Sequence, residues 1–162
     1  MARSIFILLL ICSGSFVKAQ EQKVVAASKF EEIEFLFKTE TDSVHVINFW
    51  ATWCGPCVAE LPYFMEASET FANQAVKFSF VSMDFKNQYE SKLLPFLKKN
   101  QLPGNQFNLW DMDYNAWIDK VSPAWSGAIP ITVIMSPKGK LLATSSFESS
   151  EELFELIAKS LD

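Results

Sequence analysis

The chain is poor in the residues that several classes of protein need. Its 162 residues include three cysteines, one histidine and a single arginine, Arg3, and the formal net charge is -5. A nucleic-acid-binding face needs clustered lysine and arginine, but the longest lysine run here is the pair Lys98-Lys99. A secreted disulfide scaffold needs more cysteines, spread along the chain to join distant loops. The sequence therefore disfavours both classes.

The composition does support one folded domain with a full hydrophobic core. Apolar residues make up 49% of the sequence and charged residues 20%, and the chain has fifteen phenylalanines and five tryptophans. These proportions are typical of globular proteins and not of disordered ones. A length of 162 residues fits a single domain better than two.

The first 19 residues have the pattern of a secretory signal peptide. Arg3 precedes the apolar run Ile5–Ile11, and small residues lead to a cleavage site after Ala19. The apolar run is shorter than the roughly 20 residues that a membrane span needs. Cys12 follows the run, as in lipid-anchored proteins, but bulky Ile11 stands where such signals have a small residue. We expect an exported protein, periplasmic in a bacterium, with a signal peptide at 1–19.

The expected mature domain, residues 20–162, contains a regular alternation of strand and helix patterns. Strands are expected at 44–50, 76–83, 107–110, 131–135 and 141–145, and helices at 28–38, 56–72, 87–100, 113–121 and 151–161. Residues 20–27 are expected to form a loose lead, and Ser28 with Glu31 has the pattern of a capping box. Pro95 predicts a kink or a late start in its helix. This order predicts an α/β fold, a central mixed β-sheet with helices on both faces.

Cys54 and Cys57 lie where the first predicted strand meets a helix. Unpaired N–H groups and the helix dipole favour a thiolate there, so the pKa of Cys54 is expected to be lowered. A thiolate is the attacking species in disulfide exchange, and Cys57 is one turn further on the same side. Pro56 suits the first helical turn, and Gly55 lets a partner backbone approach closely. The pattern favours a redox-active dithiol.

A zinc site and an inert bridge are the alternatives for this pair. Zinc usually takes four ligands, whereas the expected mature chain offers two cysteines and His45, which lies in a predicted strand. A disulfide between Cys54 and Cys57 closes too short a loop to stabilise a fold much. A redox-active dithiol is therefore the preferred interpretation of the pair.

The residues around the pair resemble a known superfamily. The stretch Asn48-Phe49-Trp50-Ala51-Thr52-Trp53-Cys54-Gly55-Pro56-Cys57 resembles the active-site stretch of the thioredoxin superfamily. Val58-Ala59-Glu60-Leu61-Pro62 is similar to the exported TlpA/ResA-type branch, and Trp125–Thr132 resembles the loop of that branch that carries a cis-proline. The resemblance implies a thioredoxin-like fold for the mature chain, with Cys54 and Cys57 as its catalytic residues.

The resemblance also implies a substrate-binding surface. Pro130 corresponds to the cis-proline facing the cysteines, and Ile129 offers its backbone to an extended substrate segment. Trp53, Gly55 and Pro56 belong to the same substrate-facing surface. A trans proline at the start of a strand and a Trp53 that packs in the core are the alternatives.

Glu60 is the third catalytic candidate. It lies three residues after Cys57 and therefore on the same helical face. In ResA-like proteins a glutamate at the matching place handles protons, which implies that a buried Glu60 takes the proton of Cys57. A solvated helix glutamate is the alternative. Thioredoxin has a buried Asp where this chain has Asn48, which cannot act as a base and only forms hydrogen bonds, so proton transfer would rest on Glu60.

By this resemblance the protein is a thiol–disulfide oxidoreductase that reduces protein disulfides outside the cytoplasm, in cytochrome c maturation or redox homeostasis. A disulfide oxidase or isomerase of the same fold and a non-catalytic binding module stay open. A peroxiredoxin is disfavoured, because it has a threonine three residues before its nucleophile and Thr52 is two before Cys54.

The expected partners are protein thiols and disulfides and a thiol electron-donor protein. We expect no bound cofactor, no metal and no nucleic acid, and loose membrane association only if the signal stays uncleaved. The tryptophan-rich segment 102–126 is expected to fill the core, with a role in partner choice as the alternative.

Overall fold

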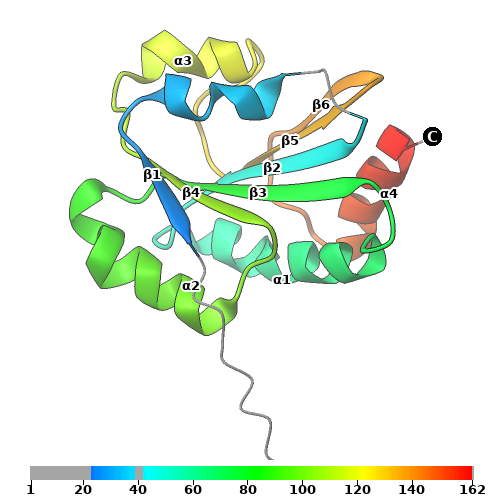
Figure 1. The fold of residues 1–162 in the computed structure, drawn as a ribbon, viewed down its shortest axis with the longest axis horizontal. Coiled ribbons are helices and arrows are strands. Elements are labelled where there is room, and N and C mark those ends of the chain that lie inside the picture. The colour runs from blue at the N-terminus through cyan, green and yellow to red at the C-terminus, as the bar shows by residue number, and fades with distance from the viewer. Residues whose placement is uncertain (1–22, 39–41, 162) are drawn as a thin grey trace, which may run out of the picture.

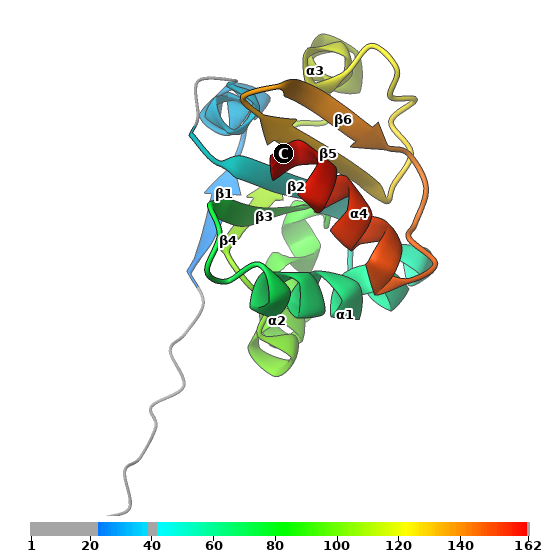
Figure 2. The same cartoon turned by 90° about the vertical axis from the view of Figure 1, so that its right-hand side faces the viewer.

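The computed structural model describes residues 23–38 and 42–161, which form a six-stranded sheet between two layers of helices (Figures 1 and 2). The strands are β1 (Val24–Ala27), β2 (Val44–Trp50), β3 (Val76–Ser82), β4 (Asn105–Leu109), β5 (Ile131–Ser136) and β6 (Gly139–Ala143). The α-helices are α1 (Gly55–Thr70), α2 (Leu94–Asn100), α3 (Tyr114–Val121) and α4 (Ser150–Leu161). The predicted α/β fold with a mixed sheet is confirmed.

The sheet has the strand order β1-β4-β3-β2-β5-β6. The first four strands of this order run parallel, β5 is antiparallel to β2, and β6 is antiparallel to β5. Strand β2 therefore lies where the parallel part meets the antiparallel part. The β2–β5 register pairs Phe49 with Ile131 and Asn48 with Thr132, so the end of β2 lies beside the start of β5.

Strand β2 is an almost continuous apolar run because helices cover both faces of the sheet. Within it, His45 is half-buried, and its Nε2 lies 2.8 Å from the Ser79 hydroxyl. Burial, with a smaller contribution from Lys77, lowers the pKa of His45 to about 4. His45 is therefore a neutral strand residue at pH 7.

Each face of the sheet has its own hydrophobic core. On one face α1, α2 and α4 pack together, and on the other α3 packs with two short 3-10 turns, Phe30–Glu32 and Glu34–Phe37 (Figures 1 and 2). The first core includes Trp50, Leu61, Phe64, Phe80, Leu97 and Ile157. The second includes Phe30, Phe49, Trp117, Trp125, Val133 and Met135.

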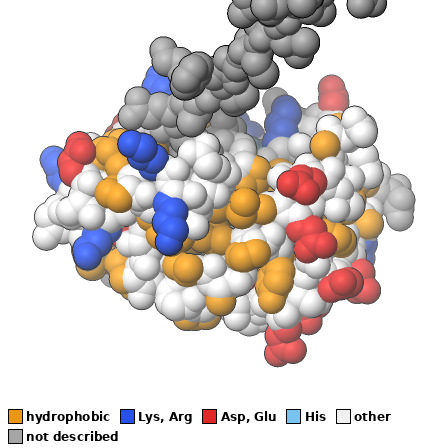
Figure 3. Space-filling model, turned by 90° about the horizontal axis from the view of Figure 1, so that it is seen from below, with side chains coloured by type: hydrophobic (Ala, Val, Ile, Leu, Met, Phe, Trp, Pro, Cys, Tyr) orange, Lys and Arg blue, Asp and Glu red, His pale blue; other side chains and the backbone are white. Residues whose placement is uncertain are grey.

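The outer side of α1 and α2 is partly apolar. In Figure 3, hydrophobic side chains gather on this face between lysines on one side and acidic residues on the other. A hollow of about 270 Å³ between the two helices is lined by Val58, Leu61, Pro62, Met65, Phe96, Lys99, Asn100 and Leu102. Lys99 is the one titratable residue in this lining. The hollow is therefore mainly an apolar surface, without a cluster of reactive side chains.

The N-terminal segment departs from the sequence-based expectation. Residues 24–27, expected as a loose lead, form β1, because their backbone pairs in parallel with that of β4. The helix expected at 28–38 is two 3-10 turns, since the buried Phe30, Ile33 and Leu36 recur every three residues, the 3-10 period. Glu32 rather than Glu31 accepts the capping hydrogen bonds, from the N–H groups of Ser28 and Lys29.

The irregularity predicted at Pro95 is confirmed. A π-helical turn at Tyr89–Leu93 precedes α2, and Pro95 lies in the first turn of that helix. The expected signal peptide at 1–19 lies outside the described residues. No helix in residues 23–38 or 42–161 is long and apolar enough to cross a membrane.

Candidate active site

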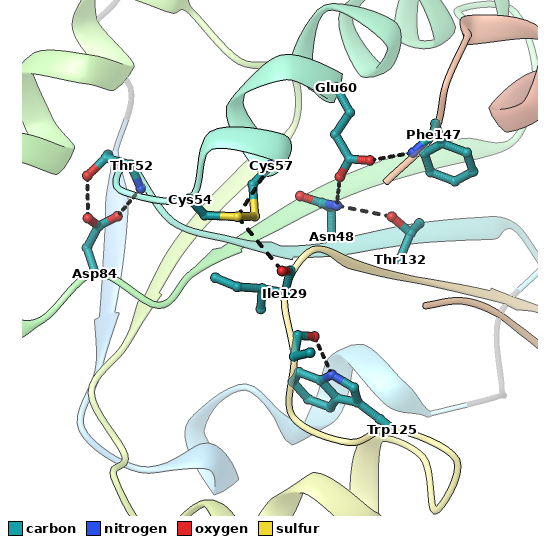
Figure 4. Close-up of a disulfide and its surroundings, with 11 residues drawn as sticks. Asn48, Thr52, Cys54, Cys57, Glu60, Asp84, Trp125, Ile129, Thr132 and Phe147 are labelled. Atoms are coloured by element: carbon teal, nitrogen blue, oxygen red, sulfur yellow. Dashed lines mark hydrogen bonds between the residues drawn. A yellow bond between two sulfur atoms is a disulfide. The ribbon is translucent and has the colours of Figure 1, made fainter. Parts of the chain in front are cut away.

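Cys54 and Cys57 form a disulfide at the N-terminus of α1 (Figure 4). Cys54 is the N-cap residue, and its Sγ accepts a hydrogen bond of 3.3 Å from the Cys57 N–H. Pro56 lies in the first turn, where its missing N–H has no helical partner to lose. Cys54 is 6% exposed and Cys57 is fully buried, so an incoming molecule meets the sulfur of Cys54 first.

The loop before β5 faces this disulfide. The Ile129–Pro130 peptide bond is cis, and the Ile129 carbonyl oxygen lies 3.9 Å from the Sγ of Cys54. Pro130 is buried and Ile129 is half-buried. The structure therefore brings together two segments that the sequence separates by 75 residues.

The surface around Cys54 is open. Trp53 is 52% exposed, and its ring stacks on that of Phe85 with 6.2 Å between the ring centroids. Gly55 and Pro56 are also exposed, and a Cβ added at Gly55 would meet no atom within 4 Å. Trp53 is thus a surface residue beside the disulfide rather than part of the core.

Glu60 is buried, with 1% of its surface exposed. Its Oε1 accepts a hydrogen bond of 3.0 Å from Asn48 Nδ2, and its Oε2 accepts one of 2.9 Å from the Phe147 N–H (Figure 4). Burial raises the pKa of Glu60 to about 7, against the opposing effect of these two hydrogen bonds. A carboxyl group of this kind accepts and releases a proton near neutral pH.

Asn48 links Glu60 to the sheet. Its Nδ2 donates to Glu60 and also to the Thr132 hydroxyl, at 3.0 Å. Its Oδ1 has no hydrogen-bond partner among the described residues, and Figure 4 shows it turned toward the side of the disulfide. A buried acceptor without a partner costs stability, and native proteins contain only about a few such groups per 100 residues.

Sequence reasoning missed Asp84, which fixes the loop between β2 and α1. Asp84 is fully buried and accepts hydrogen bonds from the Thr52 N–H, at 3.0 Å, from the Thr52 hydroxyl and from the Ser82 hydroxyl, at 2.7 Å. The Thr52 side chain therefore bonds to Asp84 rather than to a cysteine. The available signal was the position of Asp84 just after β3, because sites in α/β folds form at the carboxyl ends of strands.

Trp125 fixes the loop that carries Ile129 and Pro130, as Asp84 fixes the loop between β2 and α1. Its indole N–H donates a hydrogen bond of 2.7 Å to the Ala128 carbonyl, and its ring packs 4.8 Å from that of Phe49. These contacts tie the residues before Pro130 to the core. No group of three or more metal-ligating side chains converges in residues 23–38 and 42–161.

A model of the AhpC/TSA family matches residues 18–144. The chain belongs to the AhpC/TSA family. This AhpC/TSA-family chain is 46% identical over 55 residues to a thioredoxin of Malassezia sympodialis, a match that covers 34% of this chain and 52% of that protein. It is 25% identical over 113 residues to the thiol-disulfide oxidoreductase ResA of Bacillus cereus, covering 67% of this chain and 58% of ResA. The matches thus span only about half the length of these curated relatives.

Solved structures give the fold of the AhpC/TSA-family chain. It superposes on a thiol:disulfide interchange protein of the thioredoxin family from Chlorobium tepidum TLS with a TM-score of 0.60. The sequence identity is 17%, and the superposition covers 75% of this chain and 81% of that one. The predicted thioredoxin-like fold is confirmed.

Proposed function

We propose that this protein is a thiol–disulfide oxidoreductase that exchanges disulfides with protein substrates through Cys54 and Cys57. The observation that carries the proposal is the disulfide at the N-terminus of α1, whose outer sulfur faces the Ile129–Pro130 loop at 3.9 Å. The surface beside this disulfide is open, since Trp53, Gly55 and Pro56 are exposed. The similarity to a thioredoxin and to ResA supports the same activity.

The first step starts from the reduced pair. The Cys54 thiolate, stabilised by the Cys57 N–H, attacks one sulfur of a substrate disulfide. A new sulfur–sulfur bond forms to Cys54, the substrate bond breaks, and the departing substrate thiolate takes up a proton. Trp53, Gly55 and Pro56 bound the surface where this substrate lies, and the backbone of Ile129 beside Pro130 aligns its extended segment.

The second step releases the substrate. Cys57 attacks Cys54, the mixed disulfide breaks, and the second substrate sulfur leaves as a thiol. Two electrons have then moved from the Cys54–Cys57 dithiol to the substrate. Glu60 takes the proton of Cys57, because its buried carboxyl has a pKa of about 7 and lies on the same helix, three residues further on.

The direction and location belong to the same proposal. We place the protein outside the cytoplasm, in the periplasm of a bacterium, because residues 1–19 have the signal-peptide pattern. We assign it a reducing role, in cytochrome c maturation or redox homeostasis, since the thioredoxin that it resembles belongs to a reducing class. A donor protein with thiols would regenerate the dithiol.

The test is turnover together with reduction potential. The mature protein is equilibrated in defined thiol/disulfide buffers while tryptophan fluorescence is followed, because Trp53 adjoins Cys54. We expect a two-electron transition near or below about −230 mV, as in thioredoxin and glutaredoxins. A midpoint near about −120 mV would instead indicate an oxidant.

The variant Cys54→Ser separates an enzyme from a binding module. We expect it to lose all reduction of a protein disulfide, whereas Cys57→Ser should accumulate a mixed disulfide visible on a non-reducing gel. A Cys54→Ser protein that still binds its partners, beside a wild type without any redox transition, would support a binding module.

A further inference from the structure

A second hollow opens beside Trp53, at the carboxyl ends of β3 and β4. Its volume is about 470 Å³. Its lining combines the segment after β3 with the end of β4 and the residues that follow: Met83, Asp84, Phe85, Lys86, Asn87, Leu109, Trp110, Met112 and Tyr114. Within the tryptophan-rich segment 102–126, Trp117 and Trp125 are buried in the core, whereas Trp110 lines this hollow.

The hollow exposes large apolar side chains to solvent. Met112 is 59% exposed, and Phe85 and Tyr114 are exposed as well. Exposed apolar groups that gather around a concavity typically mark a binding surface. Its wall is also ordered, because Trp110 donates its indole N–H to Asn108 and packs edge-on against Tyr89.

Phe85 links the hollow to the candidate active site. Trp53 follows Thr52 and precedes Cys54, and its ring stacks on Phe85, which lines the hollow. In Figure 4, Asp84, the neighbour of Phe85, lies on the opposite side of Cys54 from Glu60. A polypeptide held at Cys54 that runs toward Trp53 would reach the mouth of the hollow.

The charged residues of the hollow indicate which kind of ligand it can bind. Two lining residues are charged, Asp84 and Lys86. Asp84 is fully buried, and its carboxylate already accepts hydrogen bonds from Thr52 and Ser82. Lys86 is exposed, with its ammonium 5.2 Å from the centre of the Trp110 ring. The hollow therefore presents an apolar wall with one available positive charge.

We propose that this hollow binds a bulky apolar side chain of the protein substrate, with an acidic residue next to it. The inference rests on the proposed function and names the substrate class for the same site. An extended chain advances about 3.3 Å per residue, so five positions on either side of the attacked cysteine cover about 16 Å of the surface around Cys54. The apolar wall takes the side chain, and Lys86 pairs with the neighbouring carboxylate.

Synthetic peptides with one cysteine, linked to glutathione as a mixed disulfide, test this. In the parent peptide all other positions are serine or glycine, and a single phenylalanine is moved through the five positions on either side of the cysteine. We expect kcat/KM to rise about tenfold for at least one position, which is a typical gain for filling an apolar site. With phenylalanine there, a glutamate neighbour should give faster reduction than a lysine neighbour.

Variants show whether the hollow causes the preference. Met112→Ser should reduce the preference for phenylalanine to below about threefold, and Lys86→Gln should remove the difference between glutamate and lysine neighbours. Met65→Ser is the matched control, since Met65 is an exposed methionine on α1 that lines the other hollow, and it should keep both preferences.

The outcomes separate the two proposals. If the wild type reduces the parent peptide but no phenylalanine position improves it, or if Met112→Ser and Met65→Ser act alike, the inference about the hollow is wrong and the proposed function stands. If the wild type reduces neither the peptides nor a small aromatic disulfide, the proposed function fails, and the inference fails with it.

Discussion

Oε1 of Glu60 accepts a buried hydrogen bond of 3.0 Å from Nδ2 of Asn48. The bond joins the cysteine-bearing helix α1 to the central strand β2. It also places a carboxyl group in the core, where burial raises the pKa of Glu60 to about 7. The stability of the protein should therefore depend on pH through Glu60, beside an opposite contribution from His45, whose pKa is lowered to about 4.

The variant Glu60→Gln tests that dependence. The folded-state pKa of about 7 lies above the ordinary glutamate value of 4.5, so the folded chain holds a proton that the unfolded chain releases between these pH values. The contribution of Glu60 to stability is therefore fully present below pH 4.5, falls as pH rises, and is lowest above pH 7, a change of about 3 kcal/mol. His45 contributes equally to both proteins, so the difference in unfolding free energy between the wild type and Glu60→Gln should show this slope in urea denaturation of the oxidised proteins at several pH values.

An exposed glutamate on the same helix is the control for this series. Glu66→Gln removes the same charge at the surface and should keep the wild-type slope between pH 4.5 and 7. The amide that Glu60→Gln introduces can be accommodated, because Asn48 can turn its unpaired Oδ1 toward it. Parallel stability curves for the wild type and Glu60→Gln would contradict the raised pKa.

Asp84→Ala should destabilise the loop that carries Trp53 and Cys54. The change leaves the Thr52 N–H and the Ser82 hydroxyl without their buried acceptor. A loss of this kind costs about 3 kcal/mol, which urea denaturation can measure. Asp119→Ala removes an exposed aspartate of α3 and should cost much less, and equal losses for the two variants would refute a special role for Asp84.

Trp125→Phe should weaken substrate binding by loosening the loop before Pro130. It keeps a ring near Phe49 but removes the hydrogen bond to the Ala128 carbonyl, a loss of about 1 kcal/mol. We expect the KM for a protein disulfide to rise about fivefold, since about 1 kcal/mol corresponds to that factor. Steady-state kinetics at several substrate concentrations give the value.

Trp117→Phe supplies the matched comparison for this prediction. It also removes one indole hydrogen bond to a backbone carbonyl, that of Asp111 at 3.3 Å, but in α3 rather than in the loop. It should lower stability by a similar amount and leave KM unchanged. A similar rise in KM for both tryptophan variants would mean that the effect is general destabilisation.

Processing of the N-terminus is a further prediction. When the full chain is produced in a bacterium, the exported form should begin at Gln20, because the signal-peptide pattern ends at Ala19. Intact mass measurement of the periplasmic fraction tests this directly. A protein that retains residues 1–19, or that stays in the cytoplasm, would contradict the proposed location.

The sequence predicts the inner strands β2, β3 and β5 well because β-branched and aromatic residues, which favour strands, are concentrated in them. Strand β2 has the predicted bounds, and the irregularity at Pro95 follows from the missing proline N–H. The cysteine pair is equally clear, since a strand, two cysteines and a helix follow each other directly. Local patterns suffice for these features.

Features that depend on distant partners were not predictable in this way. Strand β1 is defined by its pairing with β4, and four residues carry no signal of that partner. Asp84 and Trp125 act through hydrogen bonds to Thr52 and Ala128 that only the folded chain creates. The burial of Glu60 depends on Phe147, which approaches from the segment before α4. Long-range packing decides each case.

The antiparallel direction of β5 has a consequence for how the protein becomes active during folding. Because β5 runs against β2, its first residues meet the end of β2, and the Ile129 carbonyl reaches Cys54 across 75 residues of sequence. Contacts of such long range form slowly, since a large loop must close first. A nascent chain whose β5 is still unpaired has the two cysteines without the Ile129–Pro130 loop that faces them. The rate at which turnover recovers during refolding should therefore measure how fast β5 docks against β2.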